Sequence, residues 1–271
     1  MVNGLIQAFP WQEWKSEFPR AQQIGISLME WTLDQDRLHH NPLMTPDGRA
    51  QIIRLCEEHE VEVQSITGDC FMQAPFWKAS GDQAQILKYD FMAVVRACGD
   101  LGIRFIVVPL VDNGRLENQI QEDRLIDFLQ QQSDQFAKLG LQIIFESDFN
   151  PAELARFINQ LDSKLFGINY DIGNSAAQGW SPSEEFAAYG QRILNVHVKD
   201  RVLGGATVPL GKGSAQFDLV FSELGRLGYK GNYILQTARA LDEHHADLLA
   251  RYRDMTIAWI NMHVSERVPV N

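Results

Sequence analysis

Four apolar runs in the second half of this chain each end in a side chain that can bind a metal ion. The runs end at Glu146, Asp171, His197 and Gln236, which are separated by 25, 26 and 39 residues. Each separation is about the length of one strand and the helix that returns to the next parallel strand. The C-terminal ends of the strands in a parallel barrel meet on one face. The spacing therefore predicts that four residues distant in the sequence converge at one place.

The rest of the chain continues this alternation of strand and helix. Apolar or alternating runs predict further strands at residues 4–9, 24–31, 61–66 and 105–110. Helical periodicity predicts helices over residues 46–59, 83–100, 125–139 and 242–263, among others. We count eight strand–helix units without a linker, which predicts one α/β domain over residues 1–271, a (β/α)8 TIM barrel. The absence of a Gly-x-Gly-x-x-Gly motif after the first strand disfavours a dinucleotide-binding sheet.

Three of the predicted helices begin with a polar cap followed by proline. Thr45-Pro46 supplies the cap and the first helical residue of one of them. Asn150-Pro151-Ala152-Glu153 adds a glutamate at the capping-box position, and Ser181-Pro182-Ser183-Glu184 repeats this pattern. These starts fall directly after two of the ligand-bearing runs, as expected where strand ends lead into helices.

The composition is that of a soluble protein. Among the 271 residues 45% are hydrophobic and 22% are charged. No run approaches the roughly 18 apolar residues of a transmembrane helix, and no signal peptide precedes the first helix, so no membrane association is expected. Cys56, Cys70 and Cys98 lack metal-ligand spacing. Three reduced thiols predict a cytoplasmic location.

The net charge restricts the partners of this protein. The formal net charge is −11, whereas nucleic-acid binding normally requires a basic face, so no nucleic-acid partner is expected. A small phosphorylated substrate remains compatible, because it needs only a local basic pocket. Lys199, Arg201 and Lys212 lie near the last strand ends and are candidates for such a pocket. The sequence leaves the oligomeric state open, including a homo-oligomer.

The four strand-end residues suit a hard divalent cation. Two carboxylates, one imidazole and one amide oxygen favour Mn²⁺ or Mg²⁺, while Zn²⁺ or Co²⁺ remain alternatives. Each residue has a structural alternative: an acid at a strand end is often a helix cap, and His197 on its apolar strand could be a core histidine. Gln236 is the weakest ligand of the four, because an amide oxygen binds poorly without support. The joint pattern favours one bound ion.

The motifs around these residues resemble those of the xylose-isomerase-like TIM-barrel superfamily. Glu146 lies in Phe-Glu-Ser-Asp, Asp171 in Tyr-Asp-Ile-Gly-Asn and His197 in His-Val-Lys-Asp-Arg. The resemblance covers nearly the whole chain and includes sugar and sugar-phosphate epimerases of the D-tagatose 3-epimerase and L-ribulose-5-phosphate 3-epimerase type. It implies one Mn²⁺ or related ion held by Glu, Asp, His and a second Glu, with the two glutamates acting on opposite faces of a ketose carbon.

Three positions of this chain depart from the family pattern. Gln236 stands where the second glutamate is expected, Asn174 where ketose epimerases have a histidine near the substrate, and Ala152 where they carry a further acid. An amide is not a useful base near neutral pH. With Glu146 as the only remaining base, isomerisation through an enediol becomes more credible than epimerisation. Glu30, Asp69 and Asp200 are reserve candidates for a second acid or for contacts to the substrate.

The residues thus predict a metal-dependent sugar or sugar-phosphate isomerase or epimerase, with a small carbohydrate as its partner. Two alternatives share the site: a dehydratase acting on a keto-sugar or keto-cyclitol, and a sugar-binding barrel without catalysis, which Gln236 would favour. A multi-metal nuclease of the same fold is disfavoured, because only His197 of the seven histidines ends a predicted strand.

Overall fold

The computed structural model of the protein describes residues 8–240 and 244–264. The chain divides into two compact units. The first comprises residues 1–147 and 159–167, and the second comprises residues 148–158 and 168–271. The prediction of one domain over residues 1–271 stays a prediction.

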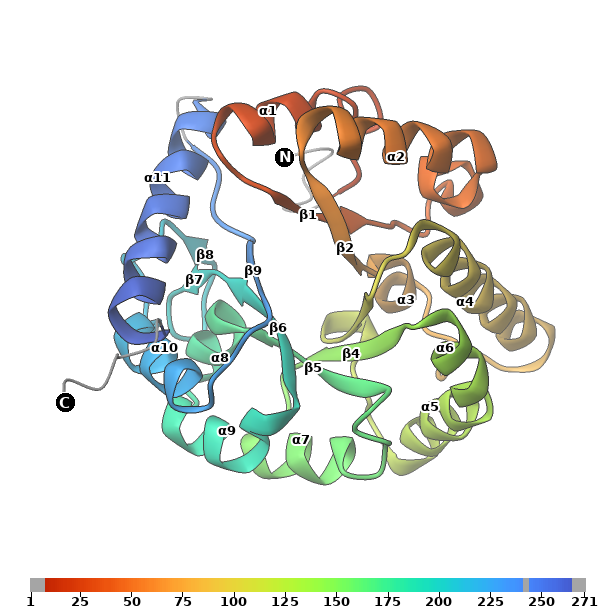
Figure 1. Ribbon diagram of the computed structural model, residues 1–271. Helices are drawn as coiled ribbons and strands as arrows, with labels where there is room; N and C mark the ends of the chain where they lie inside the picture. The colour runs from red at the N-terminus through yellow and green to blue at the C-terminus, as the bar shows by residue number, and fades with distance from the viewer. Residues whose placement is uncertain (1–7, 241–243, 265–271) are drawn as a thin grey trace. The chain divides into compact units, whose positions relative to one another are not determined.

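The first unit is built from four parallel strands, coloured orange to green in Figure 1. Strand β1 pairs with β2, β2 with β3 and β3 with β4. The strands are β1 (Leu28–Thr32), β2 (Glu62–Thr67), β3 (Phe105–Leu110) and β4 (Gln142–Ser147). The helices are α1 (Glu17–Gln23), α2 (Pro46–His59), α3 (Asp69–Gln73), α4 (Gly81–Leu101), α5 (Gln119–Gln131) and α6 (Ser133–Leu139), with 3₁₀ turns at Leu38–His40, Pro42–Met44 and Asp112–Gly114.

The core of this unit follows from the character of its strands. All six residues of β3 are buried and apolar, as is usual for a parallel strand covered on both faces. Next to it, α4 contributes Phe91, whose ring lies 4.6 Å from that of Phe71 and 5.6 Å from that of Phe128. These ring contacts join α3, α4 and α5 in the core of this unit.

The second unit contains three further parallel strands. Strand β5 pairs with β6, and β6 pairs with β9. The strands are β5 (Phe166–Asp171, in this unit from Ile168 onward), β6 (Ile193–Val198) and β9 (Asn232–Leu235), with a hairpin of β7 (Asp200–Arg201) and β8 (Thr207–Val208). The helices are α7 (Pro151–Ile158), α8 (Ile172–Gln178), α9 (Pro182–Tyr189), α10 (Phe217–Arg226) and α11 (His245–Trp259), with a 3₁₀ turn at Gly190–Arg192 and a π-helical turn at Ile260–Val264.

The predicted strands agree with the observed ones, apart from the first. Most of the predicted strand at residues 4–9 lies outside the described residues, and Ala8 and Phe9 belong to no helix or strand. The single helix predicted over 125–139 is wrong, because the chain forms α5 and α6 instead. The break lies at Gln132, which has φ −98° and ψ 1°. No helix within residues 8–240 or 244–264 has the length and apolarity that crossing a bilayer requires.

The predicted helix starts differ in how their caps are made. The Thr45 side chain accepts a hydrogen bond of 3.1 Å from Gly48 N, and Oδ1 of Asn150 accepts one of 3.0 Å from Glu153 N. Both predicted caps are confirmed. The Glu153 carboxylate accepts from the side-chain Nδ2 of Asn150 over 2.8 Å, in place of the backbone N–H that a capping box uses. The capping box at Ser181 is wrong, because the Ser181 side chain makes no capping hydrogen bond. Helix α9 begins there with proline at its first turn, whose fixed φ already suits a helix.

Candidate metal centre

Asp171 and His197 lie side by side on neighbouring strands. Asp171 ends β5, and it is the register partner of His197 on β6. The Nδ1 atom of His197 lies 3.8 Å from Oδ2 of Asp171, and the two side chains are 0% and 1% exposed. The parallel register therefore produces the convergence that the sequence spacing predicted for this pair.

Two asparagines within the strands orient the imidazole ring. The Nδ2 atom of Asn195 donates to Oδ1 of Asn169 over 2.7 Å, so the Asn169 amide turns its nitrogen toward His197. That nitrogen lies 3.1 Å from Nδ1 of His197. Asn169 thus contacts Nδ1, the same ring nitrogen that faces Asp171.

Asp171 combines two roles at the start of α8. Its Oδ1 accepts a hydrogen bond of 2.8 Å from Asn174 N and so caps the helix, while Oδ2 lies 3.2 Å from the Lys199 ammonium. Burial by itself would raise the pKa of Asp171. The Lys199 charge, the contact to His197 and the Asn174 N–H outweigh burial and lower this pKa to about 2. The carboxylate is thus ionised throughout the physiological range.

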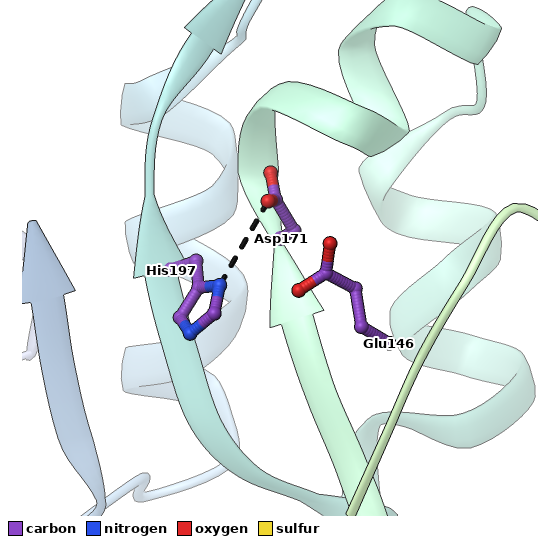
Figure 2. Close-up of side chains that lie close together, drawn as sticks. All are labelled: Glu146, Asp171 and His197. Carbon is purple, nitrogen blue, oxygen red and sulfur yellow. Dashed lines mark ion pairs between the residues drawn. The ribbon is translucent and has the colours of Figure 1, made fainter. Parts of the chain in front are cut away.

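Glu146 provides the third ligand-type side chain. It is 7% exposed and lies one residue before the end of β4. One ligand atom from each of Glu146, Asp171 and His197 lies within 4.8 Å of the others, and Figure 2 shows the three side chains turned toward one another. Two buried carboxylates and an imidazole are ligands that suit a divalent cation.

Gln236, the fourth predicted ligand, contacts a lysine. It follows the last residue of β9, where its backbone N–H donates to the Val198 carbonyl over 3.2 Å. Its side-chain oxygen accepts a hydrogen bond of 2.8 Å from Nζ of Lys199. Lys199, predicted to contact the substrate, thus lies between Asp171 and Gln236.

The other predicted basic residues lie around the β7–β8 hairpin. Arg201 donates to the Gly205 carbonyl over 2.7 Å and to Oδ1 of Asn174 over 2.8 Å, so two predicted substrate-binding residues are in direct contact. Lys212 is exposed on the loop that follows β8.

Asp200, a reserve candidate for a second acid, is surrounded by backbone N–H groups of a loop. It is fully buried, and its carboxylate accepts hydrogen bonds of 2.8, 2.8 and 3.1 Å from the backbone N–H groups of Gly211, Gly213 and Ala215. A Cβ atom on Gly213 would lie 2.2 Å from this carboxylate, so the glycine is needed for the close approach. Asp200 therefore shapes the loop that carries Lys212.

The first unit places four carboxylates near the ends of its strands. Glu30 accepts a hydrogen bond of 2.7 Å from Ser65, and Asp69 accepts one of 3.2 Å from Thr67. Asp34, which sequence reasoning missed, accepts from Phe9 N at 3.0 Å and from Gln73 at 2.9 Å. Burial, followed by the charges of Asp34 and Glu146, raises the pKa of Asp69 to about 7. Asp69 is thus partly protonated at neutral pH.

Asn169 and Asn195 were also missed by sequence reasoning. Both are buried within strands that are otherwise largely apolar. A polar side chain inside such an apolar run needs a buried hydrogen-bond partner. The presence of an asparagine in each run was therefore a signal in the sequence that the two side chains form buried contacts.

The profile of the family described as "Xylose isomerase-like TIM barrel" matches residues 18–254. The chain therefore belongs to the xylose isomerase-like TIM-barrel family, and the predicted fold class is confirmed.

Among curated proteins, an L-ribulose-5-phosphate 3-epimerase of Salmonella heidelberg (strain SL476) is 23% identical over 253 residues, 89% of this chain and 88% of the relative. Among solved structures, the 3-keto-D-glucoside 4-epimerase YcjR of E. coli has a TM-score of 0.69 at 17% identity, covering 92% of this chain and 97% of that one. The IOLI protein, solved with a bound zinc atom, has a TM-score of 0.74 at 15% identity and covers 96% and 95%. Epimerases are isomerases, so the predicted enzyme class is confirmed.

Proposed function

We propose that this protein is a divalent-metal-dependent isomerase or epimerase of a small ketose, its phosphate or a related keto-sugar. The observation that carries the proposal is the buried group of Glu146, Asp171 and His197, whose ligand atoms lie within 4.8 Å of one another. The names of the relatives support a sugar-type substrate. Mn²⁺ or Mg²⁺ suits the two carboxylates best, and the zinc atom of the IOLI protein indicates that a structural neighbour accepts a softer ion.

The residues of this group have different parts in the proposed proton transfer. A divalent ion bound here would polarise the substrate carbonyl and acidify the neighbouring C–H. Glu146 is the base in our proposal, because the family resemblance implies a glutamate at this position as a base, whereas Asp171 caps α8 and pairs with Lys199. Asp171 stays ionised beside Lys199, so it does not exchange protons near neutral pH.

Gln236 determines which reaction we favour. An amide cannot accept a proton from carbon, and its oxygen is engaged by Lys199. One base can move a proton between adjacent carbons on one face of an enediol, whereas epimerisation usually needs a base on each face. We therefore favour aldose–ketose isomerisation with Glu146 as the base.

We further propose that Asn174, Arg201, Lys199 and Lys212 face the substrate, together with Glu30 and Asp69 of the first unit. The mutual contact of Asn174 and Arg201 supports a pre-positioned pair that could receive a phosphate or a hydroxyl group. A cytoplasmic location is part of the proposal and is supported by the three free cysteines, two of them buried.

The experiment that tests the function is a turnover screen. The purified protein is stripped with EDTA and incubated with ketoses, their phosphates and keto-cyclitols, with and without Mn²⁺. Isomer formation that requires Mn²⁺ and is lost in Glu146→Gln supports the proposal. Loss of water from the substrate would instead identify a dehydratase, and metal-independent sugar binding without turnover would identify a binding protein.

Deuterium incorporation tests the single-base mechanism. Run in D₂O, the reaction should introduce deuterium with one stereochemistry and leave the configuration at C3 unchanged. Gln236→Glu restores the carboxylate that the family pattern has at this position and is expected to add slow C3 epimerisation. Efficient C3 epimerisation by the unchanged protein would contradict the mechanism, because a second base would then have to act.

A further inference from the structure

The ammonium group of Lys199 occupies the space between two predicted metal ligands. Its Nζ atom lies 3.2 Å from Oδ2 of Asp171 and 2.8 Å from Oε1 of Gln236. The lysine side chain is 13% exposed and that of Asp171 is 1% exposed, so water screens this arrangement weakly. A fixed positive charge is therefore already present beside the carboxylate that would bind the ion.

The lysine also fixes the orientation of the Gln236 amide. An ammonium group has hydrogen-bond donors only, so the amide must direct its oxygen toward Lys199 and its nitrogen away. Binding of that oxygen to a divalent ion would bring the ion and the ammonium onto the same atom. A carboxylate at this position could offset the repulsion between the two cations with its own charge, but an amide has no net charge to do so.

We propose that Lys199 is a positioning residue that keeps Gln236 from binding the metal and lowers the affinity of the site for the ion. The site would then have three protein ligands, Glu146, Asp171 and His197, and would leave the remaining coordination positions to substrate oxygens or water. This inference rests on the metal site of the proposed function.

The proposal differs from simple ligand substitution in its consequences. If Gln236 were a weak fourth ligand, its removal would weaken metal binding. If Lys199 holds Gln236 away from the ion, removal of Gln236 leaves the affinity nearly unchanged, and removal of the lysine tightens binding. The two arrangements therefore differ in the result that they predict for Gln236→Ala, while the Lys199 variants test whether the ammonium group lowers the affinity.

The experiment is the measurement of Mn²⁺ dissociation constants by calorimetry, with free Mn²⁺ followed by electron paramagnetic resonance. It is carried out on the full chain at pH 8. We expect Lys199→Met to bind Mn²⁺ about tenfold more tightly or better, because a like charge beside the ion is removed. Gln236→Ala is expected to stay within about threefold of the parent, since it loses no ligand.

Two further variants guard against misfolding and nonspecific charge effects. Lys199→Gln keeps a donor toward Asp171 and Gln236 while removing the charge, and it should also bind Mn²⁺ more tightly. Lys230→Met removes an exposed lysine of the same unit and should leave the affinity within about twofold, as expected for a solvent-screened charge. Thermal unfolding of each variant establishes that it is folded.

The outcomes separate this inference from the function on which it rests. The inference is overturned if Mn²⁺ binding is unchanged or weaker in both Lys199 variants, or if Gln236→Ala loses affinity tenfold. In that case the metal site still stands, provided that Asp171→Asn abolishes Mn²⁺ binding. If neither Asp171→Asn nor Glu146→Gln alters Mn²⁺ binding, the metal site itself is wrong and the inference falls with it.

Discussion

At the scale of single residues, the environment of a side chain determines which of several possible roles it has. Asp171 and Asp200 are both buried acids near strand ends, but their surroundings differ. One contacts His197 and Lys199, whereas the other accepts three backbone N–H groups. Sequence reasoning selected Asp171 from its motif and spacing. It could not predict that backbone N–H groups of the loop around Gly213 donate hydrogen bonds to Asp200.

His197 should be the residue whose loss is most damaging to metal binding. It is fully buried, and its Nδ1 atom lies 3.8 Å from Oδ2 of Asp171. We expect His197→Ala to weaken Mn²⁺ binding by at least about 10–100-fold, the range found when only the supporting contacts of a ligand are removed. His39→Ala serves as the control, because His39 is 55% exposed and pairs with Asp90. Equal affinities of the two variants in a calorimetric titration would rule out the proposed site.

Asp69 should make the stability of the protein depend on pH. Burial and neighbouring carboxylates raise its pKa from 3.8 to about 7, so the folded state holds a proton that the unfolded state releases above pH 4. Stability therefore falls as pH rises from about 4 to 7, and the loss is complete above pH 7. Asp69→Asn removes this penalty and should be more stable than the parent at pH 8, by about 1–3 kcal/mol.

The measurement for Asp69 is urea unfolding in EDTA at pH 5 and pH 8. The advantage of Asp69→Asn over the parent should grow between these two values. Asp82→Asn changes an exposed carboxylate at the start of α4 and should show no comparable trend. An advantage that is the same at both pH values would mean that the carboxyl group of Asp69 titrates normally.

At the scale of elements, strands were predictable and short connections were not. Residues 105–110 were predicted as a strand from an apolar run, and they form β3. Parallel strands that are buried on both faces usually consist of apolar residues, so this run was a clear signal. The β7–β8 hairpin has no such pattern. Its two strands have two residues each, and side-chain contacts such as the one from Arg201 to the Gly205 carbonyl hold the turn between them. A periodic pattern of apolar residues cannot predict contacts of this kind.

The loop after β8 supplies the prediction at this scale. In Asp200→Asn an NH₂ group replaces one of the two oxygens that accept from Gly211, Gly213 and Ala215, so at least one buried backbone donor loses its acceptor. We expect a loss of about 1–3 kcal/mol in the free energy of unfolding, measured with urea. Asp247→Asn alters a side chain that is 81% exposed and should change the stability by less than about 0.5 kcal/mol. If the two variants lose equal stability, Asp200 does not organise this loop.

At the scale of the whole chain, the alternation of strands and helices predicted the barrel, and the motifs on its strands indicated the family. The positions that depart from the family pattern, above all Gln236, determine which reaction we propose. The motifs around Glu146, Asp171 and His197 indicated the xylose isomerase-like barrel, which the match over residues 18–254 confirms. The sequence placed Gln236 correctly at the end of β9. It could not indicate the contact to Lys199, because this contact depends on two side chains from different strand ends meeting in space.

Metal binding should stabilise the chain as a whole, because the proposed ligands come from β4, β5 and β6. An ion that binds only the folded state adds about 2.7 kcal/mol at a hundred times its dissociation constant. Mn²⁺ should therefore raise the midpoint of thermal unfolding of the parent, and EDTA should reverse the change. Asp171→Asn removes one ligand but keeps the side-chain oxygen that can cap α8, so its fold should persist while the response to Mn²⁺ is lost. An equal increase in both proteins would show that Mn²⁺ binds elsewhere and would remove the physical basis for metal-assisted proton transfer at this site.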